Sequence, residues 1–480
     1  MLSSRPSPAG GLPSKGAQRR IGFWKAVFRS DLGQIYLASC DPDVRSGLAF
    51  RIVEAIVDRQ HGTNYRARVV HCPPPHLFWL MRRPAETSAR FIHRAYCRAL
   101  WRERGVVGRL GLSTWYLAWP LIFAFTSAWF TILNGRSIAR RTGKSMARQA
   151  NEQLGVAWRS NCLPPSYYMF DFFDDERRAR SDDYLHRFEL KGGIYRLLKS
   201  QPVPNIGNRS EFIERCKAND LPVPEIHVIH KAGMPIEASE LPPCDLFIKT
   251  LRGSGGTGAQ AWLYTPDDSY RSLFDGESVN RGDLLERIRR GDEDVIIQRR
   301  LVNHDSLRDL SNGALITLRV MTLLNEAGTH EATHAGLRMA IGANRLVDNS
   351  HAGGIIAAVE MQSGRLGPAT DIGLRPDIGW RTHHPDTGAP IEGRVLPFWP
   401  ETVALACRAH AAFSPRVIVG WDIAITSGGP VLIEGNGAPG IDLLQRAYRE
   451  PFGNSRLGEL MAFHLRNDPA AMALISDAKG

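Results

Sequence analysis

Residues 420–436 read GWDIAITSGGPVLIEGN, two apolar runs separated by a Ser-Gly-Gly-Pro turn, and this pattern predicts a β-hairpin. Side chains alternate between the two faces of a strand, so Glu434 and Asn436 share a face, and folding back about the turn sets Asp422 opposite them, within about 5 Å. Neighbouring carboxylates repel each other unless a cation lies between them, and Mg²⁺ shared with phosphate groups is the usual solution. The hairpin therefore predicts a metal site formed by Asp422, Glu434 and Asn436, with a solvated hairpin face as the alternative.

Upstream, residues 247–258 read FIKTLRGSGGTG, an apolar strand that ends in Lys249 and leads directly into a glycine-rich loop. Such a loop lets backbone N–H groups approach phosphate oxygens closely, and the lysine supplies a point charge. Lysine is rare in this chain, and the only one after position 249 is Lys479. The segment predicts a phosphate-binding site, with an unliganded surface hairpin as the alternative. The predicted nucleotide-binding residues of this segment are Lys249, Gly253, Ser254, Gly255, Gly256, Thr257 and Gly258.

Between these two segments, polar residues interrupt apolar stretches at Arg319, Arg338 and Asn349. Arginines on strands that look buried need anionic partners. Structural salt bridges are one explanation, and a bound phosphate or carboxylate is the other. The carboxylates nearest in sequence lie in loop-like stretches, which favours the ligand and makes these three residues candidates for catalysis.

These pieces, in this order, resemble the ATP-grasp superfamily, and most closely the sugar-transfer-associated ATP-grasp family, which is related to the α-L-glutamate ligases. Residues 295–301, VIIQRRL, look like the strand whose end meets adenine in that superfamily, and His304 stands where a ribose contact would be. The resemblance thus implies that Gln298, Leu301 and His304 bind the nucleotide. The segment that contains Asn208-Arg209 and Leu221-Pro222-Val223-Pro224 is also similar, as are Pro439-Gly440-Ile441-Asp442, Gly143-Lys144-Ser145 and Tyr167-Tyr168.

The sequence departs from the superfamily pattern at two positions. Gly420 stands where the D-alanine ligase branch carries an arginine, so Arg319 and Arg338 would have to stabilise the transferring phosphoryl group. Arg209 stands where many relatives carry a lysine.

The resemblance implies an α+β ATP-grasp fold, in which two α+β subdomains clasp ATP, preceded by a mainly helical N-terminal region. It implies an ATP-dependent carboxylate–amine ligase that forms an acyl phosphate and uses ATP and two Mg²⁺ ions. The substrates would be a small-molecule or sugar-linked carboxylate and an amine, in cell-surface polysaccharide or sugar-conjugate biosynthesis if the family name is a guide. A phosphotransferase on the same scaffold and a non-catalytic, nucleotide-binding, membrane-associated protein remain the alternatives.

The sequence predicts four parts. They are a flexible basic tail (1–20), a mainly helical region (21–185) with an uncharged segment (110–135), an ATP-grasp domain (186–455) with nucleotide loop 249–258, hinge 295–304 and metal hairpin 420–436, and a C-terminal helix or tail (456–480). The uncharged segment lies between Arg109 and Arg136, is rich in tryptophan and contains Pro120. It is long enough to cross a bilayer. A buried helix pair, an interfacial membrane segment and a spanning helix remain open.

Composition and charge restrict the class of chain, its compartment and its binding partners. The chain has 480 residues, 43% hydrophobic and 23% charged, which is ordinary for globular proteins and excludes collagen-like and wholly disordered chains. Its seven cysteines form no C-x-x-C pair, which predicts a reducing, cytoplasmic location, at the inner face of the membrane if the protein contacts one. Residues 1–180 contain 28 Lys/Arg against 12 Asp/Glu. This excess allows peripheral contact with an anionic membrane, whereas no motif predicts nucleic-acid binding.

Overall fold

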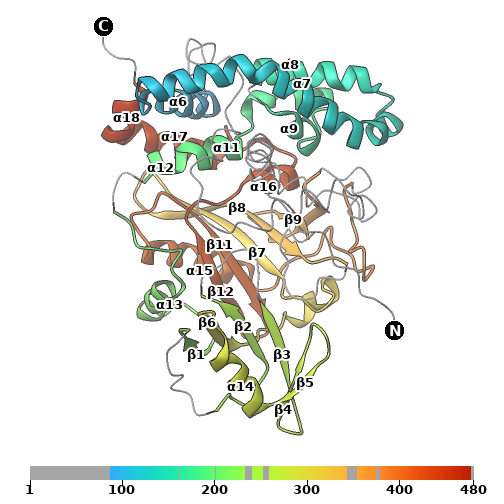
Figure 1. Cartoon of the computed structure of the whole chain (residues 1–480), viewed down its shortest axis with the longest axis vertical. Helices are drawn as coiled ribbons and strands as arrows, with labels where there is room; N and C mark the ends of the chain where they lie inside the picture. The colour runs from blue at the N-terminus through green and yellow to red at the C-terminus, as the bar shows by residue number, and fades with distance from the viewer. Residues whose placement is uncertain are drawn as a thin grey trace, which may run out of the picture. The chain divides into compact units, whose positions relative to one another are not determined.

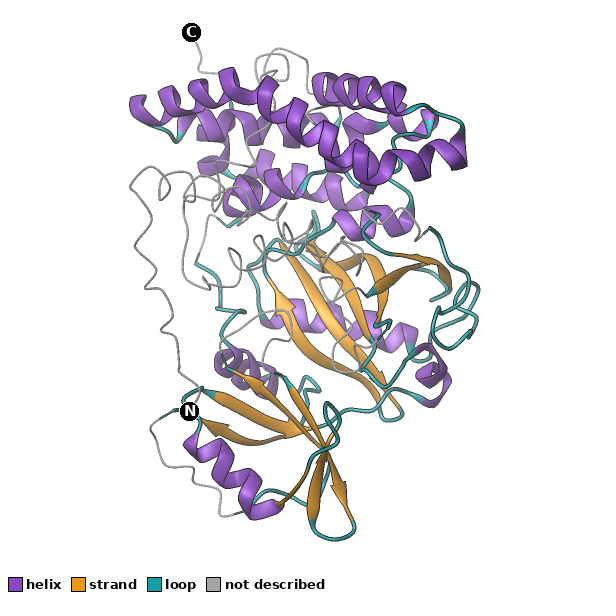
Figure 2. Cartoon of the chain, turned by 45° about the vertical axis from the view of Figure 1, so that its right-hand side comes forward, coloured by secondary structure: helices purple, strands orange, loops and turns teal. Residues whose placement is uncertain are grey.

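Two six-stranded sheets, in which every strand pair is antiparallel, form the centre of the molecule (Figure 1). Helices and strands are segregated rather than alternating (Figure 2), which confirms the α+β class. The structure is a computed structural model. It describes residues 87–160, 162–199, 202–232, 240–251, 259–342, 354–373 and 379–476, all of which fall in the unit formed by residues 73–480. The predicted tail 1–20, the glycines of the nucleotide loop and Asn349 lie outside the described residues.

Sheet A has the strand order β1-β6-β2-β3-β4-β5. One of its faces is apolar because Ile248, Trp262 and Ile297 pack with Leu284 of helix α14. Lys249 and Gln298 lie on the opposite face. Lys249 does so because it follows Ile248 directly in β2, and Gln298 does so because it pairs with Phe247, which precedes Ile248. The elements of this part are β1 (Ile226–His230), β2 (Leu246–Thr250), β3 (Gln260–Thr265), β4 (Ser269–Ser272), β5 (Ser278–Asn280), α14 (Arg281–Arg290) and β6 (Val295–Arg299).

Sheet B has the order β10-β9-β8-β7-β11-β12 and is covered on both faces. Val320 and Trp421 belong to the core that contains helix α15, whereas Met321 and Ile356 belong to the core that contains α16 and α17. Strand β11 is buried from end to end up to Ile425, because it lies between β7 and β12 and has helices on either side. The elements are η4 (Asp305–Leu310), β7 (Thr317–Leu324), β8 (His330–Met339), β9 (Ile355–Val359), β10 (Leu366–Thr370), α15 (Trp399–Ala412), β11 (Ile418–Thr426), β12 (Gly429–Asn436), α16 (Asp442–Tyr448), α17 (Arg456–Asn467) and α18 (Pro469–Ile475).

The chain before the sheets is helical, as the sequence predicts, and the C-terminal helices α17 and α18 pack against its first described helix, α6. A buried ion pair ties this region together, since His93 Nδ1 lies 2.9 Å from both carboxylate oxygens of Glu189. The boundary at residue 185 stays a prediction. The elements are α6 (Ser88–Arg102), α7 (Val106–Thr142), α8 (Met146–Ser160), α9 (Pro164–Met169), α10 (Asp175–Ala179), η2 (Ser181–Asp183), α11 (Arg187–Glu189), η3 (Leu190–Ile194, a π-helical turn), α12 (Tyr195–Leu197) and α13 (Arg209–Ala218).

The uncharged segment 110–135 forms the middle of the long helix α7, which continues through Pro120. One face of the helix is buried, at residues such as Trp119 and Phe123, while other apolar side chains of the same helix are exposed. A fully buried helix pair is therefore not what the structure shows. Among the described residues no single helix is long and apolar enough to cross a bilayer, although Val106–Thr114 and Trp119–Ile132, bent by 41°, pass that test together.

Candidate functional site

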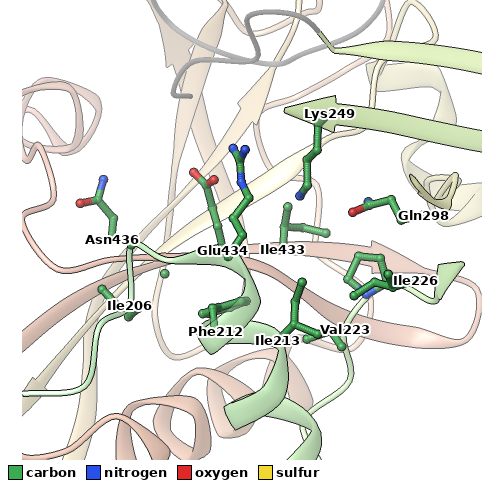
Figure 3. Close-up of a pocket in the computed structure, with 14 residues that line it drawn as sticks. Ile206, Phe212, Ile213, Val223, Ile226, Lys249, Gln298, Ile433, Glu434 and Asn436 are labelled. Atoms are coloured by element: carbon green, nitrogen blue, oxygen red, sulfur yellow. The ribbon is translucent and has the colours of Figure 1, made fainter. Parts of the chain in front are cut away.

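A pocket lies where the polar face of sheet A meets the end of strand β12 of sheet B (Figure 3). Lys249 of β2 and Gln298 of β6 line it from sheet A, and Glu434 and Asn436 of β12 line it from sheet B. The space between these walls, counted together with the solvent-open mouth, is about 660 Å³. Four of the residues singled out in the sequence are thus brought together.

Lys249 reaches the pocket from the penultimate position of β2. The pKa of its ammonium group is lowered to about 8, because burial disfavours the charge and the positive charge of Arg209 adds to this effect, while Glu434 opposes both. An ammonium group held among other cations and partly stripped of water gains strongly from an incoming anion, because the anion restores the lost electrostatic stabilisation. The site is therefore prepared for a negatively charged ligand.

Arg209 is a pocket residue that the sequence singled out only as a departure from the superfamily pattern. It is the first residue of α13, whose start is fixed by Asn208, since the Asn208 side chain accepts hydrogen bonds from the backbone N–H groups of Ser210 and Glu211. The Arg209 guanidinium donates to the carbonyl oxygen of Thr250, next to Lys249. Two cations, one from a helix start and one from a strand end, consequently flank the same wall.

The metal hairpin has the predicted register. Asp422 pairs with Glu434 and Gly420 pairs with Asn436 across the β11–β12 ladder, with a bulge between Asp422 and Ile423. Paired residues of an antiparallel ladder project to the same side. The three oxygen-bearing side chains are therefore neighbours, as the sequence indicated.

Arg319 and Arg338 continue this row of charges across sheet B. The Nε and Nη2 atoms of Arg319, on β7, donate to the two carboxylate oxygens of Asp422 at 2.5 and 3.1 Å, and Nη1 of Arg338, on β8, donates to Oδ2 at 3.0 Å. Burial of Asp422, which is 3% exposed, would raise its pKa, but the two guanidinium groups outweigh this and hold that pKa well below its ordinary value. The salt-bridge alternative is thus realised, with a partner about 100 residues away in the sequence.

Glu434 has the opposite electrostatic environment. Loss of water around its carboxylate and the neighbouring Asp422 charge raise the pKa of Glu434, and Arg319 and Lys249 only partly offset the increase. A carboxylate whose ionisation is disfavoured by a second carboxylate gains from a cation placed between them. Three hydrogen bonds from Arg319 and Arg338 reach the Asp422 oxygens, and the Glu434 carboxyl group also lies within hydrogen-bonding reach of Asp422.

These residues fit Mg²⁺, with Glu434 and Asn436 as the open oxygen donors and Asp422 as a shared one. Asn436 is available in part, because its Oδ1 also accepts a hydrogen bond from the Ala438 N–H group at 3.1 Å. Among the described residues no cluster of three His, Cys, Asp or Glu side chains is arranged to hold a metal. Any metal site here therefore depends on the amide oxygen and on the phosphates of a ligand.

Gly420 explains one departure from the superfamily pattern. A Cβ atom at this position would lie 2.8 Å from Cβ of Pro439 and 3.2 Å from Cδ of Arg319. The missing side chain makes room for Arg319 to reach Asp422. The carbonyl oxygen of Pro439 accepts a hydrogen bond from the Tyr195 hydroxyl at 2.7 Å, so the helical region contacts the loop that follows the hairpin.

Other predicted residues are not brought to the pocket. Leu301 is half-buried outside the pocket lining. His304 caps the N-terminal end of the 3-10 helix η4, where its ring accepts a hydrogen bond from the Ser306 N–H group, and its backbone N–H donates to the Ile425 carbonyl oxygen at 2.8 Å. Hinge residues 300–304 thus connect sheet A to sheet B. Residues 253–258 and Asn349 lie outside the described residues.

Sequence reasoning missed the apolar wall of the pocket. Ile206, Phe212 and Ile433 line it beside the charged groups. A sequence pattern that points to the pocket exists only for Ile433, which precedes Glu434 in the hairpin. The other two come from the loop and helix that lead into sheet A, and nothing in their local pattern points to a pocket.

A pocket between two antiparallel sheets, with Lys249 and Arg209 on one side and Glu434 and Asn436 on the other, is the arrangement of an ATP-grasp protein. The chain belongs to the sugar-transfer associated ATP-grasp family, whose model matches residues 194–456. No curated protein matches the chain.

The chain is also similar to solved structures of low sequence identity. The L-amino acid ligase from Bacillus licheniformis is 12% identical with a TM-score of 0.33, and the match covers 58% of this chain and 53% of that one. D-alanyl-alanine synthetase A from Vibrio cholerae is 12% identical with a TM-score of 0.31, covering 55% and 65%. D-alanine–D-alanine ligase from Bacillus anthracis is 12% identical with a TM-score of 0.30, covering 54% and 67%. The match therefore spans about half to two thirds of these enzymes.

Proposed function

We propose that this protein is an ATP-dependent ligase that joins a carboxylate to an amine through an acyl phosphate. The observation that carries the proposal is the pairing, in one pocket, of Lys249 and Arg209 with Glu434 and Asn436. Cations suited to phosphate and oxygen donors suited to Mg²⁺ meet there from two different sheets. Family membership and the ligase names of the similar structures support the same class of reaction.

The nucleotide would lie with its phosphates between the two sheets. Lys249 and Arg209 bind phosphate oxygens, together with backbone N–H groups of residues 253–258, and Gln298 offers an amide to the base. Leu301 and His304 are proposed at the adenine and ribose end. Asp422, Glu434 and Asn436 would hold Mg²⁺, which when bound neutralises charge on the phosphate oxygens.

Arg319 and Arg338 have two tasks in this proposal. Their hydrogen bonds to Asp422 hold that carboxylate in position, and their positive charge offsets the charge that develops on the transferring phosphoryl group. Asn349 is proposed to assist from the segment between β8 and β9. Preorganised charges of this kind require no rearrangement during the reaction.

The reaction has two balanced steps. An oxygen of the substrate carboxylate attacks the γ-phosphorus, the bond to the β-phosphate oxygen breaks, and ADP leaves. The amine nitrogen then attacks the acyl carbon and loses a proton, phosphate leaves, and an amide remains. Exclusion of water protects the acyl phosphate between the steps. The acid is proposed to be a small or sugar-linked carboxylate in cell-surface polysaccharide or sugar-conjugate synthesis, on the cytoplasmic side where ATP is present.

The test is a screen for ADP release with paired carboxylates and amines, read by mass spectrometry for a new amide. We expect ADP release that requires both partners and that is lost in Lys249→Ala. Lys217→Ala is the matched control, because Lys217 is an exposed lysine of α13 outside the pocket lining. ADP release with a phosphorylated product and no need for an amine would favour a phosphotransferase instead. ATP binding without turnover for any pair would favour a non-catalytic role.

A further inference from the structure

Helix α7 presents a continuous apolar stripe to solvent. Leu117, Leu121, Phe125 and Ile132 are 83%, 78%, 53% and 67% exposed. Their spacing of four, four and seven residues places them on one face of an α-helix. Leu110, 63% exposed, lies before the 41° bend that separates Val106–Thr114 from Trp119–Ile132, so the straight part of the stripe, from Leu121 to Ile132, is about 17 Å long at 1.5 Å per residue. Apolar surfaces of this extent are rare on monomeric proteins unless something binds them.

The opposite face of α7 is committed to packing within the protein. Gln153 of α8, which is 1% exposed, donates to Thr131 Oγ1 at 2.8 Å and accepts from the Ser127 hydroxyl at 3.0 Å. Trp119 and Phe123 form a small core with Ala157 of α8. The helix is therefore held in one rotational orientation, and the apolar stripe is a fixed feature of the surface.

The charge of α7 is of one sign. Its 37 residues include four arginines and no aspartate or glutamate. Arg136 and Arg140 follow Ile132 at intervals of four residues, so they continue the exposed side of the helix. Arg136, Arg140 and Arg141 are exposed, and none of them forms an ion pair with another described residue. Trp129, stacked on Phe125 at 6.4 Å between ring centroids, adds an aromatic ring of the kind enriched at membrane interfaces.

We infer that α7 lies flat on an anionic membrane surface, with its apolar stripe in the interface and its arginines against the lipid phosphates. Apolar side chains beside basic ones, without acidic residues, are the pattern of an interfacial helix. This inference does not depend on the proposed reaction. It would hold the protein at the membrane while leaving the pocket between the sheets in water.

Three alternative explanations of the exposed stripe fit less well. A second copy of the chain would bring two helices that carry only positive charge against each other, which is repulsive. Residues 1–86 contain 13 Lys/Arg against six Asp/Glu, so they offer no charge complementarity either. A membrane-spanning position would require α7 to leave the hydrogen bonds that join it to α8.

The experiment is co-sedimentation of the full chain with vesicles of phosphatidylcholine alone or with about 30% phosphatidylglycerol. We expect binding to the anionic vesicles that weakens at high salt, and little binding to the neutral ones. The double variant Leu121→Glu/Phe125→Glu should bind at least tenfold more weakly. The matched control is Phe274→Glu, because Phe274 is 82% exposed in the turn between β4 and β5, and it should bind like the wild type.

Further variants test the arginines and the apolar side chains of α7 separately. Arg136→Gln and Arg140→Gln should each lower affinity for anionic vesicles about fivefold and leave affinity for neutral ones unchanged. Leu117→Gln replaces the most exposed residue of the stripe, so it reports on binding if the double variant proves to be unfolded.

Four outcomes would overturn the inference. They are no binding of the wild type to anionic vesicles, equal loss of binding in Phe274→Glu, a wild-type dimer that Leu117→Gln dissociates without any vesicle binding, and resistance of the cellular protein to carbonate extraction. The last result would indicate a spanning helix.

Discussion

Replacing Glu434 by glutamine separates a metal ligand from a structural carboxylate. The change keeps the shape of the side chain and removes its charge. Asp422 and Glu434 are paired across the ladder with their carboxyl groups within hydrogen-bonding reach, and two charges about 3–5 Å apart repel by about 3–6 kcal/mol at an effective dielectric constant of about 20. The Glu434 side chain as a whole is exposed at the pocket surface, although its carboxylate is partly desolvated beside Asp422, so solvent screening reduces this repulsion to about 1 kcal/mol. We therefore expect the ligand-free variant to be as stable as the wild type or slightly more stable.

The response to Mg-ATP should change in the opposite direction. At a concentration of 100 Kd, a ligand stabilises the wild type by about 2.7 kcal/mol, and a hundredfold loss of affinity reduces this to about 0.4 kcal/mol. For a chain of 480 residues, 1 kcal/mol corresponds to about 1 °C in Tm. The wild type should therefore gain about 3 °C, and Glu434→Gln less than 1 °C, with turnover abolished.

The assay is thermal unfolding with and without Mg-ATP, together with ADP release. Magnesium-free ATP serves as the control for binding that does not involve the metal. The reasoning would be refuted if Glu434→Gln unfolded several degrees lower without ligand but still gained the full increment from Mg-ATP. Glu434 would then be a structural carboxylate, and most of the proposed site would be wrong.

Three further predictions concern other parts of the molecule. Lys249→Ala should weaken ATP binding at least tenfold in calorimetry while Tm stays within about 1 °C, because burial already disfavours the ammonium charge; unchanged affinity with a lower Tm would make Lys249 structural. Gly420→Ala places a Cβ atom against Arg319 and should destabilise the protein by about 1–3 kcal/mol in urea unfolding and reduce turnover, so an unchanged variant would contradict the described packing. The third prediction concerns the buried His93–Glu189 pair. Burial lowers the pKa of His93, but the charge of Glu189 outweighs burial and raises the pKa of His93 above 6.5. Burial raises the pKa of Glu189, but the charge of His93 outweighs burial and lowers the pKa of Glu189 below 4.5. The ion pair should therefore stabilise the fold most between about pH 4.5 and 6.5. This stabilisation should fall as pH rises through the folded-state pKa of His93 and as pH drops through the folded-state pKa of Glu189. A Glu189→Gln variant whose loss of stability did not vary with pH would refute this prediction.

The local sequence pattern was sufficient to predict the hairpin 420–436 and the strand that carries Lys249. Both depend on the two-residue alternation of strands and on a short turn, so neighbours in space are also neighbours in sequence. The α+β class and the family followed from the order of such segments, and the structure and the match to residues 194–456 confirm both. The roles of the individual site residues stay predictions.

Tertiary structure alone decided where the arginines of the site lie. Asp422 accepts hydrogen bonds from both Arg319 and Arg338 because β11 is inserted beside β7, a pairing across about 100 residues that no local pattern encodes. Arg209 joins Lys249 because the start of α13 lies beside the end of β2. The same holds for the orientation of helix α7, whose middle segment 110–135 carries no charge that would mark one side as exposed. Which side of it faces water is set by the partners that α8 and α9 provide, because burial depends on what packs against a residue and not on the residue itself.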